Sequence, residues 1–358
     1  MHMQRETSAS APGRICLFGE HQDYLNLAVI PSAINLRTSI EIIRTTQEGG
    51  KIKIHALDLD EIFTFDLSNL SGFKDDDVGY FKAGTKVMMD EGYMNEDLSL
   101  EVSVKSEIPI KSGLSSSAAL LVSWIQVLSK AAGSSLSPPE IGMLAYRAEH
   151  DVMEIPCGMM DQLSSAIGGI FHLQCTTPPV IDPLDARLKG LIVADTRVRK
   201  STSQVHGTRV KETLEGLNHL QTLMDLDISV TPFSEIEPNL KELDDIEHDR
   251  LVAVFMNRDI TSKAYRLLKE KPRDYSKIGT LLTDHQKYLR DYFEVSIEKI
   301  DRILEVGIES GALGGKLTGA GLGGSVILLA PGHEKEVCEA IREIDAIPYH
   351  VSVDRGVF

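Results

Sequence analysis

The chain contains few cysteines, the residues on which disulfide-stabilised and many zinc-binding proteins depend. Its 358 residues include four cysteines and a single tryptophan. The cysteines stand far apart, with no Cys-x-x-Cys pair, at Cys16, Cys157, Cys175 and Cys338. Neither a disulfide framework nor a zinc site is therefore expected, and a reducing compartment such as the cytoplasm suits this cysteine usage.

Basic residues are also scarce relative to acidic ones. Lys and Arg number 37 against 53 Asp and Glu, which gives a formal net charge of −16. Nucleic acid and anionic membranes are bound by basic faces, so neither is expected as the main partner. A nucleotide remains possible, because local backbone amides, Mg²⁺ and one or two cations are enough to hold its phosphates.

Long apolar runs are missing as well. No uninterrupted apolar stretch approaches the ~18 residues that a membrane-spanning helix needs. Residues 1–10 are polar, so no signal peptide is predicted there. With 42% hydrophobic and 25% charged residues, the composition is that of an ordinary globular protein. We expect a cytoplasmic protein that works as a monomer or small homo-oligomer.

The most informative stretch is residues 109–119, which read Pro-Ile-Lys-Ser-Gly-Leu-Ser-Ser-Ser-Ala-Ala. It joins an alternating apolar segment, expected to be a strand, to a long apolar segment, expected to be a buried helix. The first amides of a helix lack internal partners and carry partial positive charge, and small side chains let an anion approach them. The stretch predicts a phosphate site, or else a Gly/Ser linker or serine-capped helix that binds nothing. It is not a Walker A loop, because no Gly-Lys-Ser/Thr follows at the required spacing.

A cluster of charged residues follows a short apolar strand expected at residues 15–18. Glu20, His21 and Asp23 lie within four residues of one another. Two carboxylates and a histidine at a strand end suit general acid–base catalysis or the binding of a polyol. The alternative is a turn whose charged side chains are simply exposed to solvent.

Strands concentrate early in the chain and helices late. Apolar runs and alternation predict strands at residues 15–18, 29–30, 38–43, 51–56, 61–67, 98–104, 170–173, 191–196, 325–329 and 349–353. Helical periodicity predicts helices at residues 78–89, 118–132, 141–150, 210–224, 260–268, 278–292, 297–310 and 334–344. Residues 235–250 are expected to be loop and surface helix, and the glycine-rich residues 314–324 a turn with close backbone approach. These elements predict an α+β fold with two domains, residues 1–190 and 191–358.

Four segments, taken together, resemble one superfamily, the GHMP small-molecule kinases. Residues 109–118 match their phosphate-binding motif, Pro-x-x-x-Gly-Leu-Ser-Ser-Ser-Ala, and residues 316–324 match their glycine-rich third motif. Residues 13–24 look like the galactokinase signature, and residues 156–162, Pro-Cys-Gly-Met-Met-Asp-Gln, are close to the galactokinase Pro-Cys-Gly-Ile-Met-Asp-Gln. The four motifs follow the family order over most of the chain.

This resemblance implies a two-domain GHMP kinase fold with the active site in the interdomain cleft. It also implies transfer of the γ-phosphoryl group of ATP to the anomeric hydroxyl of a sugar. Asp161 matches the catalytic aspartate and Arg14 the cation that keeps it ionised, while Glu149 and Ser117 match Mg²⁺ ligands. The other implied site residues are Lys111, Ser112, Gly113, Leu114, Ser115, Ser116, Ser117 and Ala118 for the ATP phosphates, Glu20, His21, Asp23, Gly158 and His206 for the substrate, and Thr318, Gly319, Ala320 and Gly321 in the third motif. The plain alternatives are that Glu149 is a surface acid at a helix end and Asp161 a helix N-cap.

The chain departs from the galactokinase pattern around the sugar. Gln22 replaces a threonine, residues 25–27 read Leu-Asn-Leu after the tyrosine, and His206 stands where a Tyr-x-x-Arg motif has tyrosine. The sugar, galactose or a related neutral one, is therefore left open. Two other hypotheses compete: a non-catalytic sugar and ATP sensor on the same fold, and a GHMP kinase for another small alcohol such as an N-acetylhexosamine, a pentose or a mevalonate-like compound.

Overall fold

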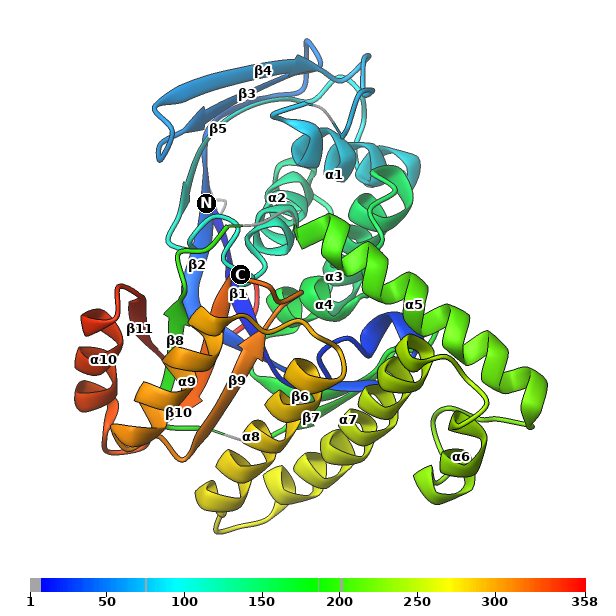
Figure 1. Ribbon diagram of the computed structural model, residues 1–358. Helices are drawn as coiled ribbons and strands as arrows, with labels where there is room; N and C mark the ends of the chain where they lie inside the picture. The colour runs from blue at the N-terminus through cyan, green and yellow to red at the C-terminus, as the bar shows by residue number, and fades with distance from the viewer. Residues whose placement is uncertain (1–7, 75, 186, 200–201) are drawn as a thin grey trace.

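Two β-sheets of different size organise the described part of the chain (Figure 1). The computed structural model describes residues 8–74, 76–185, 187–199 and 202–358, the side chains of residues 202–206 excepted. Among them, a seven-stranded sheet has the order β4-β3-β5-β2-β6-β7, with β1 paired to β2. Its strands are β1 (Ser8–Phe18), β2 (Ala28–Thr46), β3 (Lys51–Ala56), β4 (Glu61–Asp66), β5 (Ser99–Ser106), β6 (Ile170–Gln174) and β7 (Val180–Leu184). The smaller sheet, in the order β11-β8-β10-β9, contains β8 (Leu191–Asp195), β9 (Gly314–Thr318), β10 (Ser325–Leu329) and β11 (Ile347–Val351).

The helices divide between the two sheets. Those of the first half are α1 (Gly79–Asp90), α2 (Ser116–Ala132), α3 (Pro138–Arg147) and α4 (Met160–Ile167), and both α2 and α4 pack on β1 and β2. Those of the second half are α5 (Thr202–Leu223), α6 (Phe233–Leu240), α7 (Asp245–Lys269), α8 (Tyr275–Asp291), α9 (Glu298–Glu309) and α10 (Glu334–Glu343). Of these, α9 and α10 cover the small sheet, while α7 and α8 lie side by side (Figure 1). The fold is α+β, as predicted, and we propose the domain boundary between β7 and β8.

Helix α2 is the centre of the largest hydrophobic core. Its side chains are apolar on nearly every face, and most of them are buried, as the sequence predicted. Trp124 is fully buried and its indole Nε1 donates to the Phe81 carbonyl oxygen at 2.9 Å and to Thr85 Oγ1 at 3.0 Å. The sequence predicts the end of this helix at Gly133, and Gly133 does end it, in the left-handed conformation with φ at 76°. The Ser-Pro-Pro-Glu sequence of residues 137–140 predicts a capping box, which is present at the start of α3.

Several predicted boundaries were wrong. The two short strands expected at 29–30 and 38–43 are one strand, β2, because the residues between them continue the pairing with β1, as Ser32 does with Ile15 and Ala33 with Arg14. The glycine-rich segment expected to be all turn begins as strand β9, where its small residues let β9 pack closely on neighbouring backbone. A Cβ on Gly314 would lie 1.9 Å from the Gly279 carbonyl oxygen. The helix expected at 260–268 begins much earlier, at Asp245, because Asp244 caps it by accepting from the Glu247 amide at 2.8 Å. Strand β7 was missed, since its Pro183 suits only an edge strand.

Trp124 gives a test of this core. Replacing it by Ala removes a fully buried indole and leaves a cavity beside α1, which typically costs about 3–5 kcal/mol. We expect Trp124→Ala to lower the free energy of unfolding in urea, followed by circular dichroism, by that amount. Val230→Ala, at a side chain that is 70% exposed, serves as the control and should change it by less than about 0.5 kcal/mol. Equal stabilities for the two variants would contradict the assignment of α2 as the core helix.

Candidate active site

An ion pair between Arg14 and Asp161 lies at the middle of the predicted site. Arg14 comes from β1 and Asp161 from the first turn of α4. The guanidinium binds the carboxylate through two contacts, Nε to Oδ1 at 2.7 Å and Nη2 to Oδ2 at 2.8 Å. The Arg14 side chain is 5% exposed and that of Asp161 30%, so the carboxylate keeps one side open. Both oxygens of Asp161 bind side chains rather than helix amides, which excludes the N-cap alternative.

Two further contacts connect this pair to the predicted phosphate-binding loop. Arg14 Nη1 donates to the Gly113 carbonyl oxygen at 2.7 Å, and Ser115 Oγ donates to Asp161 Oδ2 at 2.5 Å. The Ser115 side chain makes no cap hydrogen bond to α2. The serine-capped helix considered from the sequence is therefore wrong.

The loop itself winds through left-handed backbone conformations before α2 begins at Ser116. The φ angles are 55° at Lys111, 78° at Gly113 and 60° at Ser115. Ser112 is buried and donates to the Pro109 carbonyl oxygen at 2.7 Å, which closes the turn. Such a winding turn directly before a helix N-terminus presents successive amides on one side, the arrangement that binds phosphate oxygens.

The glycine-rich third motif lies against this loop. A Cβ on Gly113 would lie 2.9 Å from the Thr318 carbonyl oxygen, and one on Gly319 would lie 3.1 Å from the Gly113 carbonyl oxygen. A Cβ on Gly324 would similarly lie 3.0 Å from the Ser112 carbonyl oxygen. Gly319 and Gly324 therefore contact the phosphate-binding loop through backbone alone, which favours glycine at these two positions. Ala320 and Gly321 belong to the same turn.

Glu149 lies in a π-helical turn, Ala148–Val152, that extends α3. It is 6% exposed, which excludes a surface acid, and burial raises its pKa. Its Oε1 accepts from Ser117 Oγ at 3.2 Å and from the Tyr80 hydroxyl at 3.4 Å, while Oε2 accepts from Gln162 Nε2 at 2.7 Å. Neither Tyr80 nor Gln162 was predicted as a site residue. Gln162 directly follows Asp161 and ends the motif at residues 156–162, whereas no sequence pattern marks Tyr80.

The charged cluster after β1 is largely buried. Glu20 is 3% exposed, and its oxygens accept from Lys316 Nζ and from the Gly319 amide, both at 2.7 Å. His21 is buried and stacks on the Phe293 ring, with the ring centres 5.0 Å apart. These contacts exclude the alternative of a solvent-exposed turn.

Asp23 packs against Gly158 in the same region. A Cβ on Gly158 would lie 2.0 Å from Asp23 Oδ2, so only glycine fits there. Burial, then the nearby carboxylates of Asp161 and Glu20, raise the pKa of Asp23 from 3.8 to about 7, although Arg14 opposes the shift.

The departing residue Gln22 and the arginine that matches the galactokinase pattern, Arg209, are now placed. Gln22 is buried, and its Nε2 donates to the Val254 carbonyl oxygen of α7 at 3.0 Å. Arg209, the arginine of the matched Tyr-x-x-Arg motif, pairs with Glu212 at 2.7 Å. The side chain of His206 lies outside the described residues.

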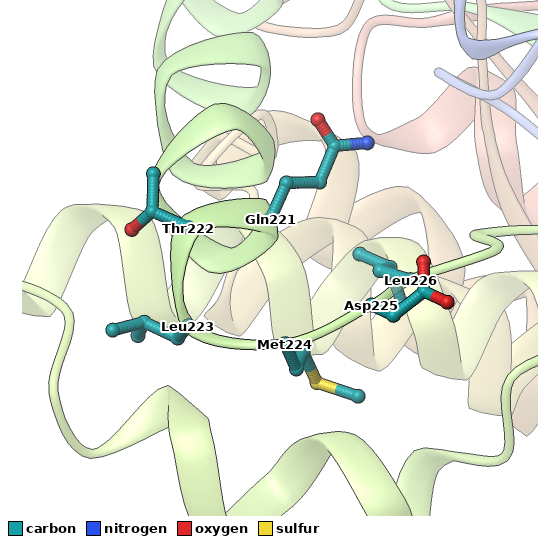
Figure 2. A pocket seen from close by; sticks show the side chains of 6 residues that line it. All are labelled: Gln221, Thr222, Leu223, Met224, Asp225 and Leu226. Atoms are coloured by element: carbon teal, nitrogen blue, oxygen red, sulfur yellow. The ribbon is translucent and has the colours of Figure 1, made fainter.

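Other features of the molecule lie away from this site. The hollow in Figure 2 is lined by residues 221–226 at the end of α5, and no predicted site residue contributes to it. Within the described residues, no group of three or more His, Cys, Asp and Glu side chains is arranged to hold a metal ion by itself.

None of the helices in the described ranges is both long and apolar enough to cross a bilayer.

Comparison with known proteins gives three family matches. Residues 2–43 match the galactokinase galactose-binding signature, residues 80–169 the GHMP kinases N-terminal domain, and residues 264–345 the GHMP kinases C-terminal model. A galactokinase of Haemophilus influenzae strain PittGG is 30% identical over 352 residues, covering 96% of this chain and 89% of the relative. A galactokinase of Thermotoga neapolitana is 30% identical over 340 residues, covering 93% and 91%.

Solved structures agree with these matches. The crystal structure of Lactococcus lactis galactokinase complexed with galactose superposes with a TM-score of 0.87 at 25% identity, covering 98% of this chain and 94% of the other. Methanococcus jannaschii mevalonate kinase, at 20% identity and a TM-score of 0.75, covers 99% and 100% and shares the fold.

The raised pKa of Asp23 predicts how this site affects stability. Between pH 3.8 and about 7 the unfolded chain loses a proton that the folded protein retains, so this group's contribution to stability falls as pH rises through that window. Asp23→Asn removes the ionisation. We expect the melting temperature of the ligand-free variant, relative to wild type, to be higher at about pH 8 than at about pH 5.

Differential scanning fluorimetry across this pH range checks the prediction. Asp60→Asn, in an exposed turn with φ at 53°, is the matched control, since Asn tolerates that backbone conformation. Its melting-temperature difference from wild type should not vary with pH in the same way. A pH-independent difference for Asp23→Asn would contradict the burial of this carboxylate.

Proposed function

This chain belongs to the galactokinase family of the GHMP kinases, and from that premise we propose that it transfers the γ-phosphoryl group of ATP to the anomeric hydroxyl of galactose. The observation that carries the assignment of roles is the Arg14–Asp161 pair, whose half-open carboxylate adjoins the phosphate-binding loop. Sugar and ATP are the proposed partners. The four cysteines are free thiols, which supports a reducing compartment such as the cytoplasm.

Asp161 is proposed as the catalytic residue. Its carboxylate accepts or orients the proton of the sugar hydroxyl, whose oxygen attacks the γ-phosphorus while the bond to the β,γ-bridging oxygen breaks and ADP leaves. Arg14 holds the carboxylate in place by its two contacts at 2.7 and 2.8 Å. Ser115 fixes Oδ2 from the other side. Phosphoryl transfer needs mainly positioning and charge neutralisation, and these contacts supply the positioning of the base.

The phosphate-binding residues are proposed to act through their backbone. No side chain of the N-cap residue Ser115 caps the first amides of α2, so these amides are available to phosphate oxygens. The dipole of α2 favours negative charge at this end. The exposed Lys111 adds a cation at the mouth of the loop. The glycine-rich turn at 318–321 closes the loop from the opposite side.

A Mg²⁺ ion fits the oxygens at the start of α2. Glu149 Oε1 and Ser117 Oγ lie 3.2 Å apart, and the side chains that donate to the buried carboxylate, those of Ser117, Tyr80 and Gln162, are uncharged. Mg²⁺ typically takes one or two protein oxygens and completes its shell with water and substrate phosphates, so one carboxylate and one hydroxyl suffice. Glu149 and Ser117 would hold the ion, with Gln162 orienting the carboxylate. When bound, the ion neutralises charge on the transferring phosphates.

The sugar is proposed to bind beside Asp23, His21 and Gly158, with Glu20 and His206 as further contacts. Galactose is supported by the signature match at residues 2–43 and by the galactokinase relatives. The cluster is acidic, and its carboxylates would repel a uronic acid, which favours a neutral sugar.

A sugar panel tests the substrate. Galactose, glucose, N-acetylgalactosamine, a pentose and mevalonate are compared in a coupled assay for ADP, and the product is identified by NMR. We expect the highest kcat/KM with galactose and the phosphate on its anomeric carbon. ADP formation with none of the compounds, or calorimetry that shows tight sugar binding without turnover, would overturn the kinase assignment.

Asp161→Asn tests the catalytic role. The amide is isosteric but cannot accept the proton, so kcat should fall by about 10²–10⁴-fold while the galactose Kd changes by less than about threefold. Asp151→Asn, at an exposed position in the turn that contains Glu149, is the matched control and should leave kcat unchanged. An unaltered kcat in Asp161→Asn would remove this residue from the mechanism.

A further inference from the structure

A completely buried lysine lies behind the site and has no role in the mechanism described above. Lys316, on β9, is 0% exposed, and its Nζ lies 2.7 Å from Oε2 of Glu20, which is 3% exposed. The ammonium also donates to the Cys16 carbonyl oxygen at 3.0 Å. Lysine is almost never fully buried, and a buried ion pair is costly to form, so its retention needs a reason beyond stability.

The contacts of this pair connect the proposed sugar-binding cluster to the glycine-rich turn. Glu20 belongs to the proposed sugar cluster, yet its second oxygen accepts from the Gly319 amide at 2.7 Å. The neighbouring Cys16 amide donates to Thr318 Oγ1 at 3.0 Å. The end of β1 is thus attached to the glycine-rich turn by contacts at two consecutive positions, Thr318 and Gly319.

From there the contact continues to the phosphate-binding loop. A Cβ on Gly113 would lie 2.9 Å from the Thr318 carbonyl oxygen, and one on Gly319 would lie 3.1 Å from the Gly113 carbonyl oxygen, so the backbones of the turn and the loop are in close contact. The Gly113 carbonyl oxygen in turn accepts from Arg14 Nη1 at 2.7 Å. A displacement of Gly319 would therefore move Gly113, and with it both the phosphate-binding amides and the cation beside Asp161.

We propose that the buried Glu20–Lys316 pair positions the glycine-rich turn against the phosphate-binding loop, so that Glu20, a residue of the sugar cluster, also sets nucleotide affinity. Lys316 is a positioning residue, since its contacts are with Glu20 and backbone. The inference rests on the proposed function for the identity of the nucleotide. A Glu20 that acted only as a sugar contact would have no effect on nucleotide binding in the absence of sugar.

A double-mutant cycle separates the two roles. Glu20→Gln and Lys316→Met each leave one partner buried without its counter-charge, whereas the double variant removes both charges at similar side-chain volume. The dissociation constant of ADP is measured by calorimetry with MgCl₂ and without sugar. We expect each single variant to weaken ADP binding by about tenfold and the double variant to weaken it by no more than the weaker-binding single variant, because the two residues act as one unit.

An exposed pair provides the control cycle. Lys335 and Glu339 lie 3.9 Å apart on α10 with side chains that are 82% and 58% exposed, so Lys335→Met and Glu339→Gln should leave ADP binding unchanged, singly and together. Single variants at Glu20 and Lys316 that bind ADP within twofold of wild type while only the galactose KM rises would overturn the proposal. A double variant whose loss is the sum of the two single losses, in free energy, would also overturn it, because the two residues would then act independently.

The outcome does not depend on one variant folding. If Lys316→Met is not recovered as folded protein, Glu20→Gln alone decides, because an unchanged ADP affinity in this near-isosteric variant contradicts a positioning role. Failure of the proposed function is a separate result, since it would appear as wild-type protein that phosphorylates no sugar in the panel, whatever the ADP cycle gives.

Discussion

The site depends on one buried guanidinium. Arg14 binds the Asp161 carboxylate through two of its nitrogens and the Gly113 carbonyl oxygen through the third. A planar fork with fixed donor directions can hold a carboxylate and a loop carbonyl in one geometry, which a lysine could not do. The position of the base relative to the phosphate-binding loop is therefore set by the strand that carries Arg14, which is paired along its length with β2.

The second constraint is backbone proximity. The phosphate-binding loop and the glycine-rich turn are separated by roughly 200 residues in sequence, yet they touch without intervening side chains at Gly113, Gly319 and Gly324. At Gly158, the lack of a side chain instead leaves room for the side chain of Asp23. Rigid contact between backbones leaves little tolerance for movement, so charged contacts that hold the turn, such as those of Glu20, affect the loop as well.

Features of the fold that depend on neighbouring residues could be predicted from the sequence, and those that depend on tertiary packing could not. The capping box at Ser137, the C-cap at Gly133 and the burial of α2 followed from propensities and periodicity, and the structure has them. The start of α7 was missed because it depends on the cap at Asp244, and strand β9 was missed because a glycine-rich strand takes its structure from packing rather than from local preference. Tyr80 lay outside every recognisable pattern, since only the fold brings α1 to Glu149.

By itself, the sequence determined the family, the order of the motifs and the residue types that phosphoryl transfer requires, because these reside in short segments whose spacing is read directly from the chain. The tertiary structure decided which partners those residues have. It gave Ser115 to Asp161 rather than to the helix end, buried Glu20 against Lys316, and raised the pKa of Asp23. These outcomes depend on distances between segments far apart in the sequence and on exclusion of water, and neither quantity is encoded in any single segment.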